Sequence, residues 1–300
     1  MTISRSTSAR WIPVVATLGA SALFATSGTA RVVSDVSADS VTIAAVRLTI
    51  GALGLIAISS FVGRFKELIR LWRMPLVWVM GAGVAAYQAL FFIGTGRVGV
   101  AVGTLASLAL GPLMAGLLAW ALGAKRPEAI WWVSTVVAIA GLTVLTLGGL
   151  DSSVSIDVIG VLAAVGAGSA YSVYTVLGSR LSTPTTNATD VLAASFIIGS
   201  LVLIPLAIPH LNELNSAAGV GLSLWLGLAA TTAAYVCFGI GITYLAPGTV
   251  ATLNLAEPVI ATVFGVVLLG EVIQGLTAVG CALIALALVI LSVSTIKGEK

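Results

Sequence analysis

Residues 101–108 read AVGTLASL and residues 246–253 read APGTVATL, so both follow the pattern Ala-x-Gly-Thr-x-Ala-x-Leu. The second segment begins 145 residues after the first, close to half of the 300-residue chain. Further matches recur at offsets of 146 to 148 residues: Gly111-Pro112 with Glu257-Pro258, Leu122-Gly123 with Leu269-Gly270, Gly19-Ala20 with Gly166-Ala167, and Ile50-Gly51 with Ile198-Gly199. Self-similarity at one offset indicates an internal duplication.

The composition indicates the solvent in which the two halves fold. Apolar residues make up 59% of the chain and charged residues only 8%, whereas a soluble domain carries about 25% charged residues. A soluble enzyme is therefore excluded, and continuous apolar runs of about 20 residues favour spanning helices over a β-barrel. We predict an all-α polytopic membrane protein with ten transmembrane helices near 11–31, 40–62, 74–95, 98–122, 128–148, 157–180, 189–209, 218–243, 247–269 and 273–296.

The basic residues predict the orientation of these spans, because cytoplasmic loops of membrane proteins carry an excess of Lys and Arg. With the N-terminus in the cytoplasm, Arg31 and Arg97 fall in outer loops and Arg47 lies within a span. The other 11 of the 14 fall on the cytoplasmic side: Arg5, Arg10, Arg64, Lys66, Arg70, Arg73, Lys125, Arg126, Arg180, Lys297 and Lys300. We therefore predict a multi-pass protein of the cell (inner or plasma) membrane with both termini cytoplasmic.

The duplication and the span count together predict how the halves are related. Each half, residues 1–150 and residues 151–300, holds five spans, and this odd number makes the second half enter the membrane in the opposite sense. Two five-helix inverted-topology repeats are common in secondary transporters, where the halves exchange conformations around a central site. We expect alternating-access transport, with a static duplicated membrane protein as the alternative.

The ordered motifs also resemble those of a known family. Arg47 in the second span, Pro112, Glu257-Pro258 and Leu269-Gly270-Glu271 are together similar to the EamA family of the drug/metabolite transporter (DMT) superfamily, over essentially the whole chain. Within that family the chain looks most like the YddG-type aromatic amino-acid exporters. The resemblance implies ten helices around a central cavity and export of small metabolites, and it alone supplies the direction of transport. One departure is Gly123-Ala124, where the family often has Gly-Glu; the acid stands at Glu128 instead, which implies a differently capped turn.

Arg47 is one of two ionisable residues deep within the spans, where a charge is costly and usually functional. It lies about seven residues from the outer end of its span, which corresponds to roughly 10 Å. We expect it either to meet a substrate carboxylate in an outer vestibule or to anchor the structure through carbonyls or an outer acid such as Asp35 or Asp39. Its counterpart in the second half lies near Ser195, so the charge is not duplicated.

Glu257 is the second deep ionisable residue, and it stands directly before Pro258 in the ninth span. Proline removes a backbone donor and frees a carbonyl about a turn earlier, near Asn254. Glu257 either meets a substrate ammonium group, takes up a proton, or serves as a structural acid at the kink. Because Pro112 and Pro258 occupy equivalent places in the two halves, we also predict that they act as paired hinges.

Polar and aromatic side chains at mid-span are the best candidates for the lining of a cavity. Buried tyrosine and glutamine side chains need hydrogen-bond partners, which a water-filled cavity supplies; simple aromatic packing is the alternative. The predicted substrate-binding residues are Tyr87, Gln88, Phe91, Ser107, Tyr171, Tyr174, Tyr235, Asn254 and Glu257. Trp72, Trp78, Trp131 and Trp132 are instead predicted to anchor the chain at the membrane interfaces.

The residue types that the sequence lacks narrow the range of possible substrates. The second half has no basic residue between Arg180 and Lys297, which argues against a multiply charged anion, and a single deep glutamate is weak support for a cation. No nucleotide-binding loop and no catalytic constellation is present. We therefore expect no enzymatic activity, no cofactor and no metal.

These observations favour a neutral or zwitterionic substrate. We predict a secondary membrane transporter that exports aromatic or hydrophobic amino acids, with methionine and threonine among them, from the cytoplasm. The alternatives are a multidrug or other small-metabolite exporter of the same superfamily, or a passive pore. The expected partners are the small-molecule substrate and the lipid bilayer, with no nucleic acid, and the chain is expected to be a monomer.

Overall fold

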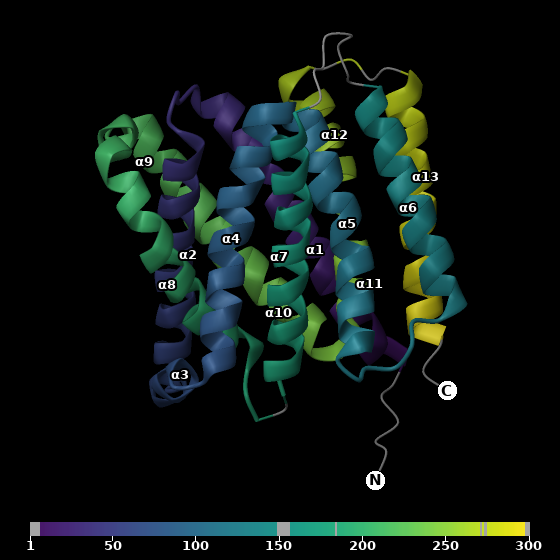
Figure 1. Cartoon of the computed structure of the whole chain (residues 1–300), viewed down its shortest axis with the longest axis horizontal. Coiled ribbons are helices and arrows are strands. Elements are labelled where there is room, and N and C mark those ends of the chain that lie inside the picture. Colours follow the sequence, from purple (N-terminus) through teal and green to yellow (C-terminus); the bar gives the residue numbers. More distant parts are fainter. Residues whose placement is uncertain (1–6, 149–156, 184, 271, 273–274, 298–300) are drawn as a thin grey trace.

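The computed structural model describes residues 7–148, 157–183, 185–270, 272 and 275–297, and every regular element among them is helical (Figure 1). Ten helical segments are long and apolar enough to cross a membrane, which confirms the predicted architecture. The elements are α1 (Thr7–Ser34), α2 (Ser40–Phe61), α3 (Phe65–Trp72), α4 (Pro75–Val98), α5 (Val100–Ala121), α6 (Ala129–Leu147), α7 (Val158–Leu181), α8 (Ala188–Ala207), the 3₁₀ helix η1 (Ile208–Leu214), α9 (Ala217–Leu224), the π-helix η2 (Trp225–Ala233), α10 (Ala234–Tyr244), α11 (Pro247–Leu253), α12 (Ala256–Leu269) and α13 (Gly275–Lys297).

The bundle has two ends, which we name from the chain termini. α1 begins and α13 ends at the same end (Figure 1), termed the terminal face, and the opposite end is the far face. The short helix α3 also lies at the terminal face and was not among the predicted spans. Leu68 and Leu71 bury one side of it while Lys66 and Arg70 remain exposed, so it is an amphipathic interfacial helix.

Polar side chains fix several helix starts. Asp39 accepts a hydrogen bond from the Thr42 backbone N–H at 2.9 Å, and Asn187 caps α8 in the same way. Such caps satisfy backbone donors that have no partner within the helix. The turn between α5 and α6 has no acidic cap: the Glu128 side chain makes no capping bond, and Arg180 donates to the Leu122 carbonyl instead.

The two halves pack against each other in mirrored pairs. α4 lies along α7, and the equivalent helices η2 and α10 lie along α1. α2 packs on α8, and α6 packs on α13 as a pair at one edge of the bundle (Figure 1). Every one of these contacts joins a helix of one half to a helix of the other. Relative movement of the halves would therefore alter the packing on both faces at once.

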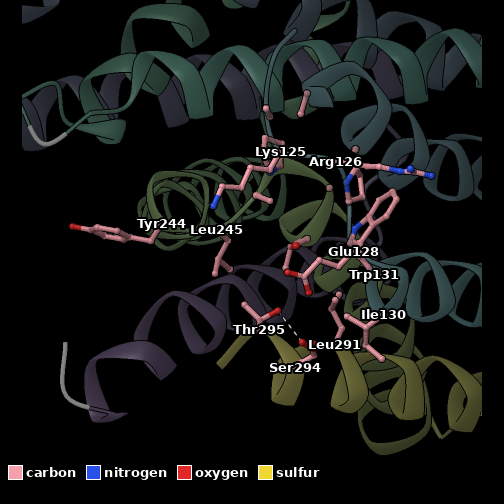
Figure 2. A pocket seen from close by; sticks show the side chains of 18 residues that line it. Lys125, Arg126, Glu128, Ile130, Trp131, Tyr244, Leu245, Leu291, Ser294 and Thr295 are labelled. Atoms are coloured by element: carbon pink, nitrogen blue, oxygen red, sulfur yellow. Dashed lines mark hydrogen bonds between the residues drawn. The ribbon is translucent and has the colours of Figure 1, made fainter. Parts of the chain in front are cut away.

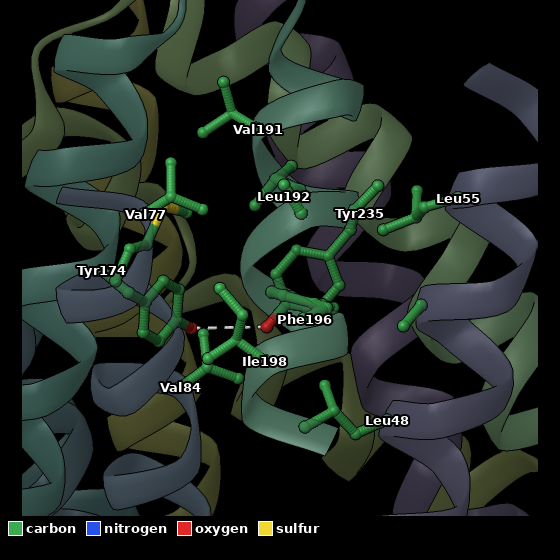
Figure 3. Close-up of a cluster of buried hydrophobic side chains, with 14 of the residues drawn as sticks. Leu48, Leu55, Val77, Val84, Tyr174, Val191, Leu192, Phe196, Ile198 and Tyr235 are labelled. Carbon is green, nitrogen blue, oxygen red and sulfur yellow. Dashed lines mark hydrogen bonds between the residues drawn. The ribbon is translucent and has the colours of Figure 1, made fainter. Parts of the chain in front are cut away.

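The largest hydrophobic cluster among the described residues runs along α8 and packs it against α2, α4, α7 and α10. Val77, Met80, Leu192 and Ile242 are at most 1% exposed and belong to this cluster. Figure 3 shows Tyr174 and Tyr235 within this cluster, with their hydroxyl groups directed toward each other. Packed apolar side chains leave no room for water, so the bundle is dry around these four apolar residues.

A charged cluster also joins the two halves at the terminal face. Asp190, in the first turn of α8, is fully buried; it accepts hydrogen bonds from Ser59 Oγ at 2.5 Å and from Arg64 Nε at 2.8 Å. A buried carboxylate needs such partners, because an unpaired one is very costly. The cluster ties the end of α2 to the start of α8.

Candidate functional site

One cavity of about 570 Å³ lies at the centre of the bundle. Its walls come from α1, α2, α4, α5, α7, η2, α10, α11 and α12, so both halves contribute. Arg31 and Val32, near the far end of α1, also line it, which means that the cavity extends toward the far face. Tyr174 and Tyr235 belong both to its lining and to the hydrophobic cluster described above.

The structure brings nearly all of the predicted site residues to this cavity. Its lining includes Tyr87, Gln88, Phe91, Ser107, Tyr171, Tyr174, Tyr235, Asn254 and Glu257, together with Arg47 and Pro112. Pro258 is not among the lining residues. α5 continues without interruption through Pro112, whereas the ninth span is divided into α11 and α12 just before Pro258. The two prolines thus differ in local structure, and their hinge role remains a prediction.

Arg47 contributes an unpaired cation to the wall. Its Nε atom is buried without a hydrogen-bond partner, and among the described residues no ion pair reaches its guanidinium. The anchoring alternatives, Asp35 and Asp39, are not its partners: Asp39 bonds to Thr42. A buried donor without a partner loses hydration and gains nothing in return, so this group is suited to a ligand with acceptor oxygens.

Glu257 contributes a carboxyl group to the same wall. Among the described residues no salt bridge of 4.0 Å or less joins it to Arg47. The break between α11 and α12 places Glu257 in the first turn of α12, where its backbone N–H donates to the Asn254 carbonyl at 3.0 Å. The cavity wall therefore carries a guanidinium group and a carboxyl group that are not paired with each other.

Four tyrosines form the end of the cavity that borders the hydrophobic cluster. The ring centroids of Tyr171 and Tyr174 are 5.2 Å apart, and Tyr87 lies 6.0 Å from Tyr171 and 6.1 Å from Tyr174. The hydroxyl groups of Tyr174 and Tyr235 are 3.3 Å apart (Figure 3). Edge-to-face rings of this kind form a rigid apolar surface with polar tips.

A hydrogen-bonded relay joins this aromatic surface to α1. Asn254 Nδ2 donates to the Tyr171 hydroxyl at 2.9 Å, and Asn254 Oδ1 accepts from Ser21 Oγ at 3.0 Å. Sequence reasoning identified Tyr171 and Asn254 but missed Ser21, as well as Phe24 and Ser27 in the cavity wall. These three lie in an ordinary apolar span, and only the fold shows which side of that span faces inward.

A second, smaller chamber of about 270 Å³ opens near the terminal face (Figure 2). It lies between the α5–α6 turn and the ends of α10 and α13, with Lys125, Glu128 and Thr295 around it. Trp131 forms one wall and is only 5% exposed. The prediction that Trp131 anchors the chain at the interface was therefore wrong, because its ring packs against Gly116 and Gly248, which leave room for it.

The far face carries an ion pair between α4 and the start of α7. Arg97 donates to an Asp157 carboxylate oxygen at 3.0 Å, and the other oxygen caps α7 at the Ile159 backbone N–H. The hydrogen bond from Arg97 is the largest reason that the pKa of Asp157 lies below its usual value, followed by the bond from Ile159. The carboxylate is therefore ionised at neutral pH.

The chain is similar in sequence to other transporters over most of its length. A transporter of Bacillus subtilis, YwfM, described as uncharacterized, is 36% identical over 274 residues, covering 91% of this chain and 90% of the relative. The threonine/homoserine exporter RhtA of Escherichia coli K12 is 30% identical over 266 residues, covering 87% of this chain and 84% of the relative. The resemblance to YddG-type exporters is not confirmed by these relatives.

The fold and the duplication are matched as well. One crystal structure superimposes with a TM-score of 0.80 over 96% of this chain and 99% of its own, at 23% sequence identity, which shows a shared fold. The model of the EamA-like transporter family matches twice, at residues 11–147 and at residues 158–293. Each match contains five of the ten spans. The chain belongs to the EamA-like transporter family.

Proposed function

We propose that this transporter exports zwitterionic α-amino acids by alternating access. The observation that carries the proposal is the unpaired Arg47 and Glu257 in the wall of one aromatic cavity. A substrate with a carboxylate and an ammonium group on the same carbon complements both charges, and charge-assisted hydrogen bonds to such groups are the strong ones. The name of the RhtA relatives, threonine/homoserine exporters, agrees with an amino-acid substrate.

In the proposed complex the substrate carboxylate binds Arg47 and its ammonium group binds Glu257. The substrate side chain then packs against Tyr87, Phe91 and Phe24, which line the same cavity. Burial of an aromatic or branched apolar side chain contributes about 1.5–3 kcal/mol. Aromatic and hydrophobic amino acids, methionine and threonine are therefore the substrates to test first.

The proposed orientation places the terminal face in the cytoplasm. α3 and the turn between α5 and α6 lie at that face (Figure 1). They carry Arg64, Lys66, Lys125 and Arg126, in agreement with the excess of basic residues in cytoplasmic loops. The cavity then faces outward, and the hydrophobic cluster around Val77 closes the cytoplasmic side. Exchange of conformation between the inverted halves would open the cytoplasmic side and close the outer one.

Transport by purified protein in proteoliposomes tests the proposal. We expect saturable, counterflow-stimulated transport of phenylalanine, methionine or threonine by the wild type, and its loss in Arg47→Ala and Glu257→Gln. Glu67→Gln, which changes a partly buried carboxylate of α3 outside the cavity, is the matched control. Absence of saturable amino-acid transport by the wild type would overturn the substrate assignment.

A hydrophobic cation is the second candidate substrate, because Glu257 beside several aromatic rings also suits such a ligand. Arg47 in the same wall disfavours it. Competition separates the two: inhibition of transport by organic cations but by no amino acid would indicate a multidrug exporter. Transport that neither saturates nor shows counterflow would indicate a passive pore.

A further inference from the structure

The relay of Ser21 and Asn254 holds the Tyr171 hydroxyl group in the cavity wall. Its ring packs against α5, since a Cβ placed on Gly111 would lie 3.1 Å from Tyr171 Cδ1. The Tyr174 ring lies 5.2 Å away on the same helix. The hydroxyl itself is joined to Asn254, and through it to Ser21. Ring and hydroxyl are therefore both fixed before any substrate arrives.

The relay leaves the Tyr171 hydroxyl with unused hydrogen-bonding capacity. A tyrosine hydroxyl can donate one hydrogen bond and can also accept. With Asn254 Nδ2 donating to it, the Tyr171 oxygen is an acceptor, and its own proton remains for a ligand. If the amide oxygen and nitrogen of Asn254 exchange places, Tyr171 donates to Asn254 and its oxygen remains as an acceptor.

A hydroxyl group is the ligand that suits both directions of the relay, because it can accept and donate. A methyl group suits neither. Asn254 also connects Tyr171 to Glu257: its side chain bonds to the Tyr171 hydroxyl at 2.9 Å, and its backbone carbonyl accepts from the Glu257 N–H at 3.0 Å. If the ammonium group binds Glu257, an oxygen close to the α-carbon on the substrate side chain can therefore bind Tyr171.

We propose that Tyr171, positioned by Asn254 and Ser21, recognises a hydroxyl group on the side chain of the substrate. The inference rests on the proposed transport of amino acids and narrows it. Among side chains of equal size, the transporter selects the one with an oxygen at the β- or γ-carbon. Threonine is thus favoured over valine, and homoserine over norvaline.

Competitive inhibition and direct transport in proteoliposomes measure this selectivity as ratios of kcat/KM for each isosteric pair. We expect the wild type to favour threonine over valine by roughly fivefold to tenfold, the effect of one hydrogen bond. In Tyr171→Phe the ratio falls to about 1, because KM for threonine rises while KM for valine is unchanged. Ser21→Ala, which loosens the relay without touching the substrate, gives an intermediate ratio.

Two variants serve as matched controls. Tyr244→Phe removes a tyrosine hydroxyl group outside the central cavity, at the end of α10, and it keeps the threonine-to-valine ratio of the wild type. Thr175→Val removes a hydroxyl group that lies beside Tyr171, one turn further along α7. It also keeps the ratio, unless the Tyr171 proton belongs to Thr175, which would contradict the proposal.

The other outcomes of these transport measurements also test the role of Tyr171. A wild-type ratio near 1, or equal loss of threonine and valine transport in Tyr171→Phe, would overturn the role of Tyr171 and leave amino-acid transport standing. Failure of the wild type to transport any amino acid would overturn the proposed function and this inference with it. If Tyr171→Phe does not fold, as judged by its thermal stability in detergent, an unchanged ratio in Ser21→Ala rejects the proposal.

Discussion

Replacement of Arg47 by alanine should remove recognition of one end of the substrate only. The guanidinium lies in the cavity wall with its Nε buried and unpartnered, so its loss breaks no bond that holds the protein together. If the substrate carboxylate binds there, Arg47→Ala abolishes the difference between an amino acid and the amine that lacks its carboxylate. The equivalent change for the ammonium group is Glu257→Gln.

The magnitude follows from the kind of bond that is lost. A hydrogen bond to a charged group contributes about 1.5–3 kcal/mol, which corresponds to roughly 10-fold to 150-fold in affinity. The Arg47 head group borders an open cavity of about 570 Å³, and water there weakens the interaction. We therefore expect the lower part of the range, roughly 10-fold to 30-fold.

A cycle of three ligands measures this effect: phenylalanine, phenethylamine, which lacks the carboxylate, and 3-phenylpropionate, which lacks the ammonium group. Competition against a labelled substrate gives the affinity of each for wild type and variants. In Arg47→Ala the affinity for phenylalanine should fall to that for phenethylamine, while phenethylamine itself binds as before. In Glu257→Gln it should fall toward that for 3-phenylpropionate. Arg47→Lys retains the charge and should restore part of the discrimination.

Equal weakening of all three ligands in Arg47→Ala would refute this reasoning. Such a result would mean that the arginine shapes the cavity and does not touch the carboxylate. An unchanged affinity for phenylalanine would refute it as well, because the cation would then lie outside the site.

Three further predictions concern the scaffold. Arg64→Ala leaves the fully buried Asp190 with Ser59 as its remaining hydrogen-bond donor and should destabilise the protein by about 2–3 kcal/mol. This is less than for a wholly buried pair, because the Arg64 side chain is 32% exposed. Thermal unfolding in detergent measures the loss, and Asp190→Asn in the same background should recover part of it. Gly116→Leu forces atoms into the Trp131 ring, since even a Cβ would lie 2.4 Å from it. We expect about 1–3 kcal/mol of destabilisation and a red-shifted tryptophan emission. An unchanged unfolding midpoint would contradict the packing of Trp131 against Gly116. The pKa of Asp157 is lowered in the folded state, so its stabilising contribution is present above the unfolded pKa and disappears as the pH falls through the folded pKa. The difference in unfolding midpoint between wild type and Asp157→Asn should therefore vanish in acid. A difference that persists in acid would reject the Arg97 contact as its cause.

The ten spans were predictable because each one must satisfy its own backbone in lipid, which imposes about 20 apolar residues whatever the neighbours. The cavity lining was predictable for a related reason. Tyr87, Gln88 and Glu257 interrupt apolar runs where a polar group is costly unless the fold provides a partner or water. Their positions in the wall agree with that reasoning, and their contacts with substrate remain predictions.

What the sequence could not indicate are features set by packing between distant segments. Ser21 and Ser27 are small hydroxyl residues of a kind found on any helix face, and only the contact of α1 with α11 and α12 makes Ser21 a partner of Asn254. Trp131 has the composition of an interface anchor, but the glycines that accommodate its ring lie on two other helices. Asp190 stands at the end of a span, where a charge normally reaches water.

The aromatic residues of the site occur in both halves of the duplicated chain, whereas its charged residues do not. Aromatic positions recur in both halves at the repeat offset, since Phe24 corresponds to Tyr171 and Tyr87 to Tyr235, and all four line the cavity. The charges do not recur: Ser195 stands opposite Arg47 and Gly111 opposite Glu257. In the proposed alternating-access mechanism, the duplicated rings can exchange places as outer and inner closures. The proposed pair of substrate-binding groups has no such substitute, so it would hold the substrate in both states, and we expect substitution of either group to impair transport in both directions.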